Sequence, residues 1–185
     1  MPHIPGSTVW DAGSTVEVAW TLQANHGGGY SYRLCPLEEF AANSSDAEAC
    51  FQRHPLTFVG QSAFRWGGIE GRTTAFNATY VTEGTSPLNS MWAMNPVPRA
   101  WRMPDGSWGA GSNHLQTGDG FTPFCKDEPG YTCTGMWGPY NMEIVDQVAI
   151  PADLPAGSYV LGWRWDCEES NQIWQSCSDI SVVRK

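Results

Sequence analysis

Residues that favour β-strands alternate with small or polar residues along most of this chain. The clearest alternation covers 14–22, and a second run, 30–34, follows three consecutive glycines. A period of two is typical of a strand that buries one face. Further runs of this kind lie at 73–81, 140–150, 158–166 and 179–183. Short strands separated by turn residues predict an all-β fold, an antiparallel, immunoglobulin-like β-sandwich.

Two regions depart from this pattern. The run 37–49 predicts one short helix, with residues 43–45 as candidate caps or breakers. The region 91–134 is rich in Gly, Pro, Trp and Asn and has little periodicity, so we expect long structured loops there, which often carry function. Because no repeat or low-complexity linker divides the 185 residues, we expect a single domain, 1–185.

Composition narrows the classes of partner. The chain is 41% hydrophobic and 16% charged, which provides enough apolar side chains for a core. Its formal net charge of −9 opposes binding to phosphate backbones, so we expect no nucleic-acid partner. A neutral polysaccharide meets no such repulsion, and ten Trp, six Tyr and seven Phe offer rings that either fill the core or stack on sugars. No apolar run approaches the roughly 20 residues of a membrane helix, so we expect no membrane partner. We also expect the protein to be a monomer.

Six cysteines fall into three local pairs. An even number without Cys-x-x-Cys spacing favours disulfides over zinc or redox chemistry, and disulfides point to a secreted, extracellular protein. Six cysteines allow 15 connectivities, so the pairing stays open. Proximity along the chain pairs Cys35 with Cys50, Cys125 with Cys133, and Cys167 with Cys177.

A histidine followed by three glycines is the first candidate for chemistry. His26 lies between the predicted strands 14–22 and 30–34, and the glycines allow the backbone angles of a tight turn. An imidazole in such a turn can ligate a metal, although an ordinary surface histidine fits the same pattern. His54 and His114 lie in loop sequences and read as solvated side chains.

The sequence around His26 resembles the second-histidine strand of lytic polysaccharide monooxygenases. The closest branch is the animal and protist type that acts on chitin and cellulose, with a chitin-binding type-4-like domain. The resemblance rests on Ala24-Asn25-His26 and on the aromatic run that ends in Leu34-Cys35-Pro36. In that family the alanine two residues before the histidine lies beside copper, and Ala24 matches this position.

The tail of the chain carries the second part of the resemblance. The segment from Gln172 to Cys177 is similar to the family pattern Gln-x-(Tyr or Phe)-x-x-Cys, which leads into the final strand. This similarity implies that Trp174 holds the axial position of the metal and that Gln172 hydrogen-bonds beside it. Tryptophan departs from the family's Tyr or Phe and offers only an N–H donor. The run 153–167 resembles the preceding strand, which is structural.

The resemblance implies copper-dependent oxidative cleavage of glycosidic bonds in chitin or cellulose, with His26 as a metal ligand. The family binds copper through three nitrogens, two of them from an amino-terminal histidine, and such a set suits copper. Here Met1 stands first and His3 is the only histidine near it, so we expect that an amino-terminal segment is missing and that the chain as given is inactive. A non-catalytic carbohydrate-binding module and a plain secreted structural domain remain alternatives.

The copper hypothesis makes one geometric prediction. His26 and Trp174 should lie at the same end of the sandwich, with Cα atoms within roughly 12 Å, since both side chains serve one metal.

Overall fold

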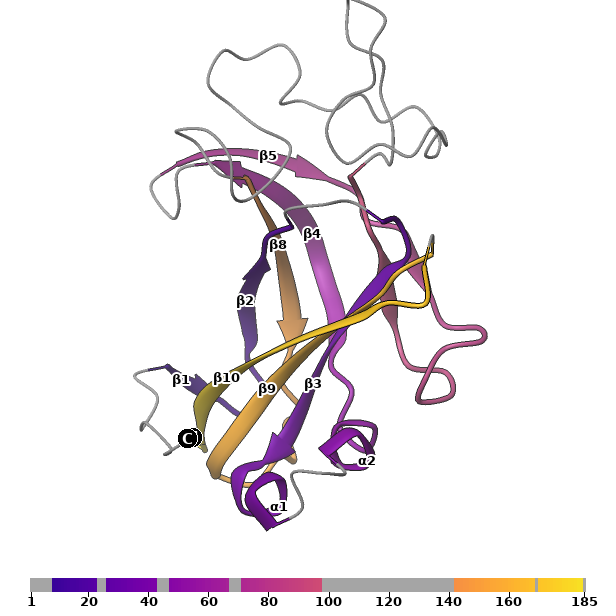
Figure 1. The fold of residues 1–185 in the computed structure, drawn as a ribbon. Coiled ribbons are helices and arrows are strands. Elements are labelled where there is room, and N and C mark those ends of the chain that lie inside the picture. Colours follow the sequence, from indigo (N-terminus) through magenta and orange to yellow (C-terminus); the bar gives the residue numbers. More distant parts are fainter. Residues whose placement is uncertain are drawn as a thin grey trace, which may run out of the picture.

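The chain forms two β-sheets and two short helices in the residues that its structure, a computed structural model, describes: 8–22, 26–42, 47–66, 71–97, 142–168 and 170–184. The larger sheet has the strand order β1-β10-β9-β3-β7-β6, and the smaller has the order β2-β8-β4-β5 (Figure 1). This arrangement confirms the predicted all-β fold with two sheets.

Both sheets are built from strands far apart in the sequence. The larger sheet contains β1 (Val9–Asp11), β3 (Gly29–Pro36), β6 (Tyr80–Val81), β7 (Trp92–Met94), β9 (Gly157–Asp166) and β10 (Ile173–Val183). The smaller sheet contains β2 (Thr15–Trp20), β4 (Thr57–Trp66), β5 (Arg72–Phe76) and β8 (Met142–Ala149). The pairings between the described strands are antiparallel, as expected for the predicted sandwich, except that β1 runs parallel to β10.

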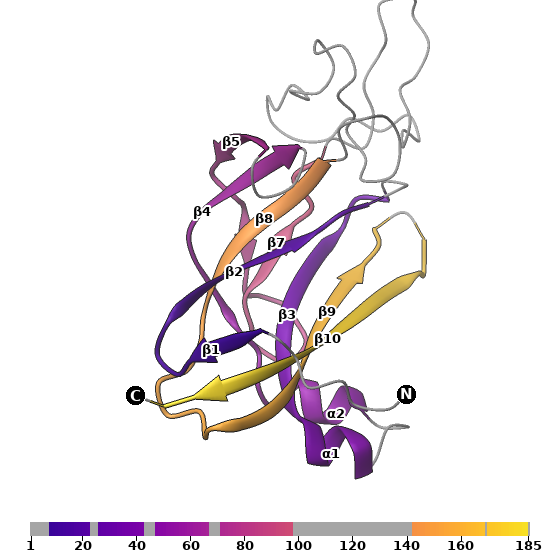
Figure 2. The same cartoon turned by 90° about the vertical axis from the view of Figure 1, so that its left-hand side faces the viewer.

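The prediction of a single helix over 37–49 is wrong, because this stretch contains two helices. The structure has α1 (Leu37–Ala42) and α2 (Ala47–Phe51) in this stretch, and residues 43–45 lie outside the described ranges. Both helices lie at one end of β3 (Figure 2). No helix in the described part of the chain has the length and apolar character to span a bilayer.

The predicted loop region 91–134 begins with a strand. Trp92–Met94 forms β7 and pairs with the start of β3, where Gly29 lies opposite Met94. Residues 98–141 are outside the described part of the chain, so the rest of the loop prediction lies there as well.

The core lies between the sheets and is largely aromatic. On β3, Tyr30, Tyr32 and Leu34 alternate toward the smaller sheet, and all three are buried. The ring of Trp20 in β2 lies 4.7 Å from that of Tyr30, so the two sheets meet through aromatic contacts. The intervening residues of β3 are buried too, because the two helices cover the other face, with Phe51 as a main contact.

One acidic side chain lies inside this core. Asp146 of β8 is fully buried, and it accepts hydrogen bonds from the Tyr30 hydroxyl at 2.9 Å and the Ser62 hydroxyl at 2.6 Å. Burial raises the pKa of Asp146 to about 6, although the hydrogen bonds from Ser62 and Tyr30 lower it. The three residues come from three strands, so the carboxyl group links the two sheets.

An ion cluster lies on the outer face of the larger sheet. Glu48 of α2 accepts hydrogen bonds at Oε1 from Arg33 Nη1 at 2.6 Å and from Arg164 Nη1 at 2.7 Å. Arg164 also donates to both oxygens of Asp166, at 2.6 and 2.8 Å. Arg33 is only 1% exposed, so the cluster fixes α2 over a buried charge.

The disulfide between Cys35 and Cys50 is confirmed, with Cα atoms 5.5 Å apart, and it ties the end of β3 to α2. The proposed pair of Cys167 and Cys177 is wrong. Cys177 lies opposite Gly162 in the β9–β10 register, whereas the Cys167 amide bonds to the Gln172 carbonyl. Five residues along a strand separate the two positions by roughly 16 Å, far beyond disulfide reach. Cys125 and Cys133 lie outside the described residues.

Gly162 lies where β9 passes beneath α2. A Cβ atom there would lie 2.7 Å from the ring of Phe51. We expect Gly162→Ala to lower the free energy of unfolding by about 1–3 kcal/mol, because the buried ring has to move. Gly157→Ala on the same strand is the matched control, since its Cβ would meet only Tyr159, at 3.8 Å. Urea unfolding measures both variants, and equal effects would contradict the clash.

Candidate functional site

The turn before β3 presents His26 at one end of the larger sheet. Gly27 and Gly28 have φ angles of 65° and 76°, in the left-handed region that favours glycine. A Cβ on Gly28 would lie 2.0 Å from the carbonyl oxygen of Asp166, so no other residue fits there. This close approach lets the Glu168 amide donate to the His26 carbonyl at 3.1 Å. The expectation that the glycines build a tight turn is confirmed.

The aromatic neighbour of His26 is Trp165. Their ring centroids lie 6.2 Å apart with an interplanar angle of 30°, a stacked arrangement. Trp165 is 5% exposed, and its indole N–H donates to the Gly27 carbonyl at 2.7 Å. One buried side chain therefore supports the imidazole and anchors the turn that carries it.

The structure brings Trp174 and Gln172 to the same end as His26. Trp174 lies directly opposite Trp165 in the β9–β10 register, so the two indoles share a face of the sheet. Trp174 is 51% exposed, as expected on the part of β10 that has no described partner strand on its outer side. Gln172 is exposed, with its side-chain Oε1 accepting from the Ser170 hydroxyl at 3.1 Å.

Strand order sets the spacing of these residues. β9 lies between β3 and β10, so the backbones that carry His26 and Trp174 are two strand spacings apart, about 10 Å across the sheet. The Cα separation of 12 Å stays a prediction. Trp165, and not Trp174, is the aromatic ring next to the imidazole. The sequence analysis interpreted the run 153–167 as structural and therefore did not single out Trp165. The signal that could have found it is the alternation of Trp163 and Trp165 with Arg164, which is typical of rings that face inward.

The donors around His26 do not make a complete metal site by themselves. Within the described ranges, no set of three or more His, Cys, Asp and Glu side chains is close enough to hold a metal ion. The carboxylate of Glu168 accepts a hydrogen bond from the Gly28 amide in the same turn, at 3.4 Å. A copper centre at this end therefore needs nitrogen donors beyond the described residues. Ala24, His3 and His114 all lie outside the described residues.

His54 belongs to a different part of the molecule. Its carbonyl accepts from the Leu34 amide at 2.9 Å, beyond the end of α2 and near the opposite end of β3 from His26. Burial, with a smaller effect of Arg53, lowers the pKa of His54. This residue therefore offers a control for any chemistry assigned to His26.

Comparison with known proteins adds little. No protein-family model matches the chain. A family 123 glycoside hydrolase from Clostridium perfringens gives a structural match with a TM-score of 0.32 and 9% sequence identity. The match covers 96% of this chain and 23% of that enzyme, so the chain spans about a quarter of its length. A likeness this weak carries no argument about function.

Proposed function

We propose that this domain is a secreted, copper-dependent enzyme that cleaves glycosidic bonds of chitin or cellulose oxidatively, similar to lytic polysaccharide monooxygenases. The observation that carries the proposal is the joint position of His26, Trp174 and Gln172 at one end of the larger sheet. These are the three site residues that the sequence resemblance singled out. The Cys35–Cys50 disulfide supports an oxidising compartment.

The direction of β1 supports a further copper ligand from the start of the chain. β1 runs parallel to β10, with Val9 opposite Ser181, so its amino-terminal end points toward the end of β10 that carries Trp174. Six residues separate His3 from Val9, a reach of roughly 20 Å for an extended chain. Ser181 and Trp174 are seven residues apart on β10, a distance of roughly 23 Å along the strand. Even fully extended, the segment from His3 to Val9 falls short of Trp174, so a nitrogen ligand from this side would have to come from a residue before His3.

Each residue at this end has a separate task in the proposed reaction. His26 holds the metal through a ring nitrogen, and Trp165 fixes the orientation of that ring. Copper held there would supply the redox chemistry that couples reduction of dioxygen or hydrogen peroxide, with an external reductant, to oxidation of a carbon at the glycosidic bond. Gln172 offers an amide that hydrogen-bonds beside the metal. The resemblance assigned Trp174 to the axial position, but its ring is 51% exposed, so in this proposal it stacks on the sugar chain.

Removing the imidazole tests this assignment. We expect the chain to bind one copper(II) ion with nitrogen hyperfine structure in its EPR spectrum, and His26→Ala to weaken binding at least about tenfold. His54→Ala is the matched control, because His54 lies near the other end of β3. Isothermal titration with copper(II) measures all three proteins. Equal affinity of the wild type and His26→Ala would contradict the metal assignment.

A second candidate is a carbohydrate-binding domain without catalysis. Two observations favour it: the described residues contain no three-ligand metal group, and Trp174 is half exposed. Retention on chitin or cellulose separates the candidates. Full retention with EDTA present, together with unchanged copper affinity in His26→Ala, supports the binding domain. Soluble oxidised sugars that appear only with copper and a reductant support the enzyme.

A further inference from the structure

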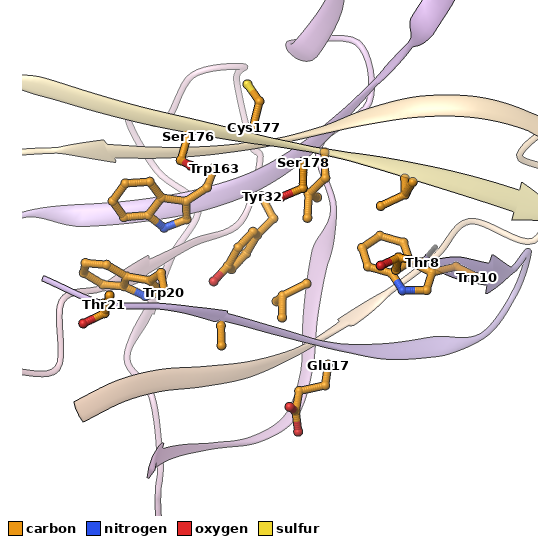
Figure 3. A pocket seen from close by; sticks show the side chains of 14 residues that line it. Thr8, Trp10, Glu17, Trp20, Thr21, Tyr32, Trp163, Ser176, Cys177 and Ser178 are labelled. Atoms are coloured by element: carbon orange, nitrogen blue, oxygen red, sulfur yellow. The ribbon is translucent and has the colours of Figure 1, made fainter. Parts of the chain in front are cut away.

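A cleft of about 480 Å³ opens between the edges of the two sheets. It lies between β2, the edge strand of the smaller sheet, and β10 with β1 at the edge of the larger one (Figure 3). Neither His26 nor Trp174 lines it. β1 pairs only with 181–183 of β10, so 173–180 has no partner strand on that side among the described residues.

Three residues that line this cleft, Trp20, Tyr32 and Trp163, have a buried hydrogen-bonding group without a partner in the described part of the chain. The hydroxyl of Tyr32 and the indole N–H of Trp163 are shielded from solvent, and neither makes a hydrogen bond within the described part of the chain. Tyr32 is 2% exposed. In Figure 3 both side chains reach toward the ring of Trp20, which lies 4.8 Å from that of Trp163. A buried donor without an acceptor is destabilising, so this end of the cleft is arranged for a ligand that brings oxygen atoms.

The lining is otherwise neutral and aromatic. Glu17 is its one acidic member, and that carboxylate is bound to Arg65 Nη1 at 2.7 Å. Trp10 forms the far wall, and hydroxyl side chains surround the opening: Thr8, Thr21, Ser176 and Ser178. None of the described residues that line the cleft is a cation, which disfavours anions. A purely apolar ligand would leave Tyr32 and Trp163 unsatisfied.

We infer that this cleft binds one or two units of a neutral saccharide. Pyranose rings have apolar faces that stack on indoles, and hydroxyl oxygens that accept from an indole N–H and a phenol O–H. The volume lies within the usual range for small-ligand sites. The site is separate from the His26 end, and it stands on the geometry of Trp20, Tyr32 and Trp163 alone.

The test uses cellobiose and N,N′-diacetylchitobiose as probes, with tryptophan fluorescence and isothermal titration as readouts. We expect saturable binding of at least one disaccharide, and Tyr32→Phe should weaken it about fivefold to tenfold through loss of one hydrogen bond. Tyr80→Phe is the matched control, since Tyr80 lies outside the cleft on β6. Without sugar, the melting temperature of Tyr32→Phe should be unchanged or higher, because the hydroxyl has no partner to lose.

A blocking variant gives a second readout. Ser176 is exposed on β10 opposite Trp163, so Ser176→Trp should close the cleft without disturbing the core. The inference is overturned if neither disaccharide binds, or if Tyr32→Phe and Ser176→Trp both bind as the wild type does. His26→Ala should keep full disaccharide affinity, so a failed copper assignment leaves this result intact. Loss of cleft binding in His26→Ala would count against a separate site.

Discussion

Replacing Glu48 with alanine is expected to lower the free energy of unfolding by about 3–5 kcal/mol. The variant removes the carboxylate that accepts hydrogen bonds from Arg33 and Arg164 on the outer face of the larger sheet. Arg164 keeps Asp166, but Arg33 is fully buried and loses its ion pair. A buried charge without a partner is among the most destabilising single changes in a protein. Denaturant unfolding at neutral pH measures the loss.

Glu38→Ala is the control, because Glu38 is an exposed acid on α1. It should change stability by less than about 0.5 kcal/mol. Equal losses in the two variants would show that Glu48 contributes no more than a surface acid. Burial raises the pKa of Glu48, but the hydrogen bonds from Arg33 and Gln52 and the charges of Arg33 and Arg164 together outweigh burial. The pKa of Glu48 is therefore lowered from its ordinary value. The stabilisation by Glu48 is therefore present above the ordinary carboxyl pKa and is lost as the pH falls through the lowered value.

The sequence pattern predicted the strands in which β-forming residues alternate with small or polar ones, and it missed the strands or parts of strands that lack this alternation. β2, β8 and β9 alternate and were predicted within a few residues. β10 was expected only over 179–183, but it begins at Ile173, because an exposed edge strand has no need for alternating apolar residues. β4 was missed because its register shifts between Val59 and Ala63, which breaks the period of two.

The candidate site was predictable in its location but not in its contacts. Three glycines after His26 indicated a tight turn, and local backbone chemistry is enough for that inference. The stacking of His26 on Trp165 depends on strand order, since β9 lies beside β3 although more than 100 residues separate them. Nothing in the sequence around Asp146 signalled that a lone acid in an apolar strand would meet Tyr30 across the sheets.

Asp146→Ala is expected to lower the free energy of unfolding by about 2–4 kcal/mol. The variant leaves the hydroxyls of Tyr30 and Ser62 buried without an acceptor, and each such group costs about 1–3 kcal/mol. Asp153→Ala is the matched control, because Asp153 is exposed in the turn before β9. Its stability should change by less than about 0.5 kcal/mol. Thermal and urea unfolding measure both variants, and a small loss in Asp146→Ala would mean that water replaces the carboxylate.

The same carboxyl group predicts an unusual dependence of stability on pH. Its folded pKa of about 6 lies above the ordinary value of 3.8, so the folded state binds the proton more tightly than the unfolded state. Ionisation of Asp146 therefore makes the fold less stable above about pH 6 than below about pH 4, and this difference of up to about 3 kcal/mol is recovered as the pH falls from 6 toward 4. Asp146→Asn has no titrating group at this position. Between pH 4 and 6 its stability should gain less on acidification than that of the wild type, because only the wild type binds this extra proton on folding. If the stabilities of the two proteins change in parallel over this range, Asp146 is not the group that binds the extra proton on folding.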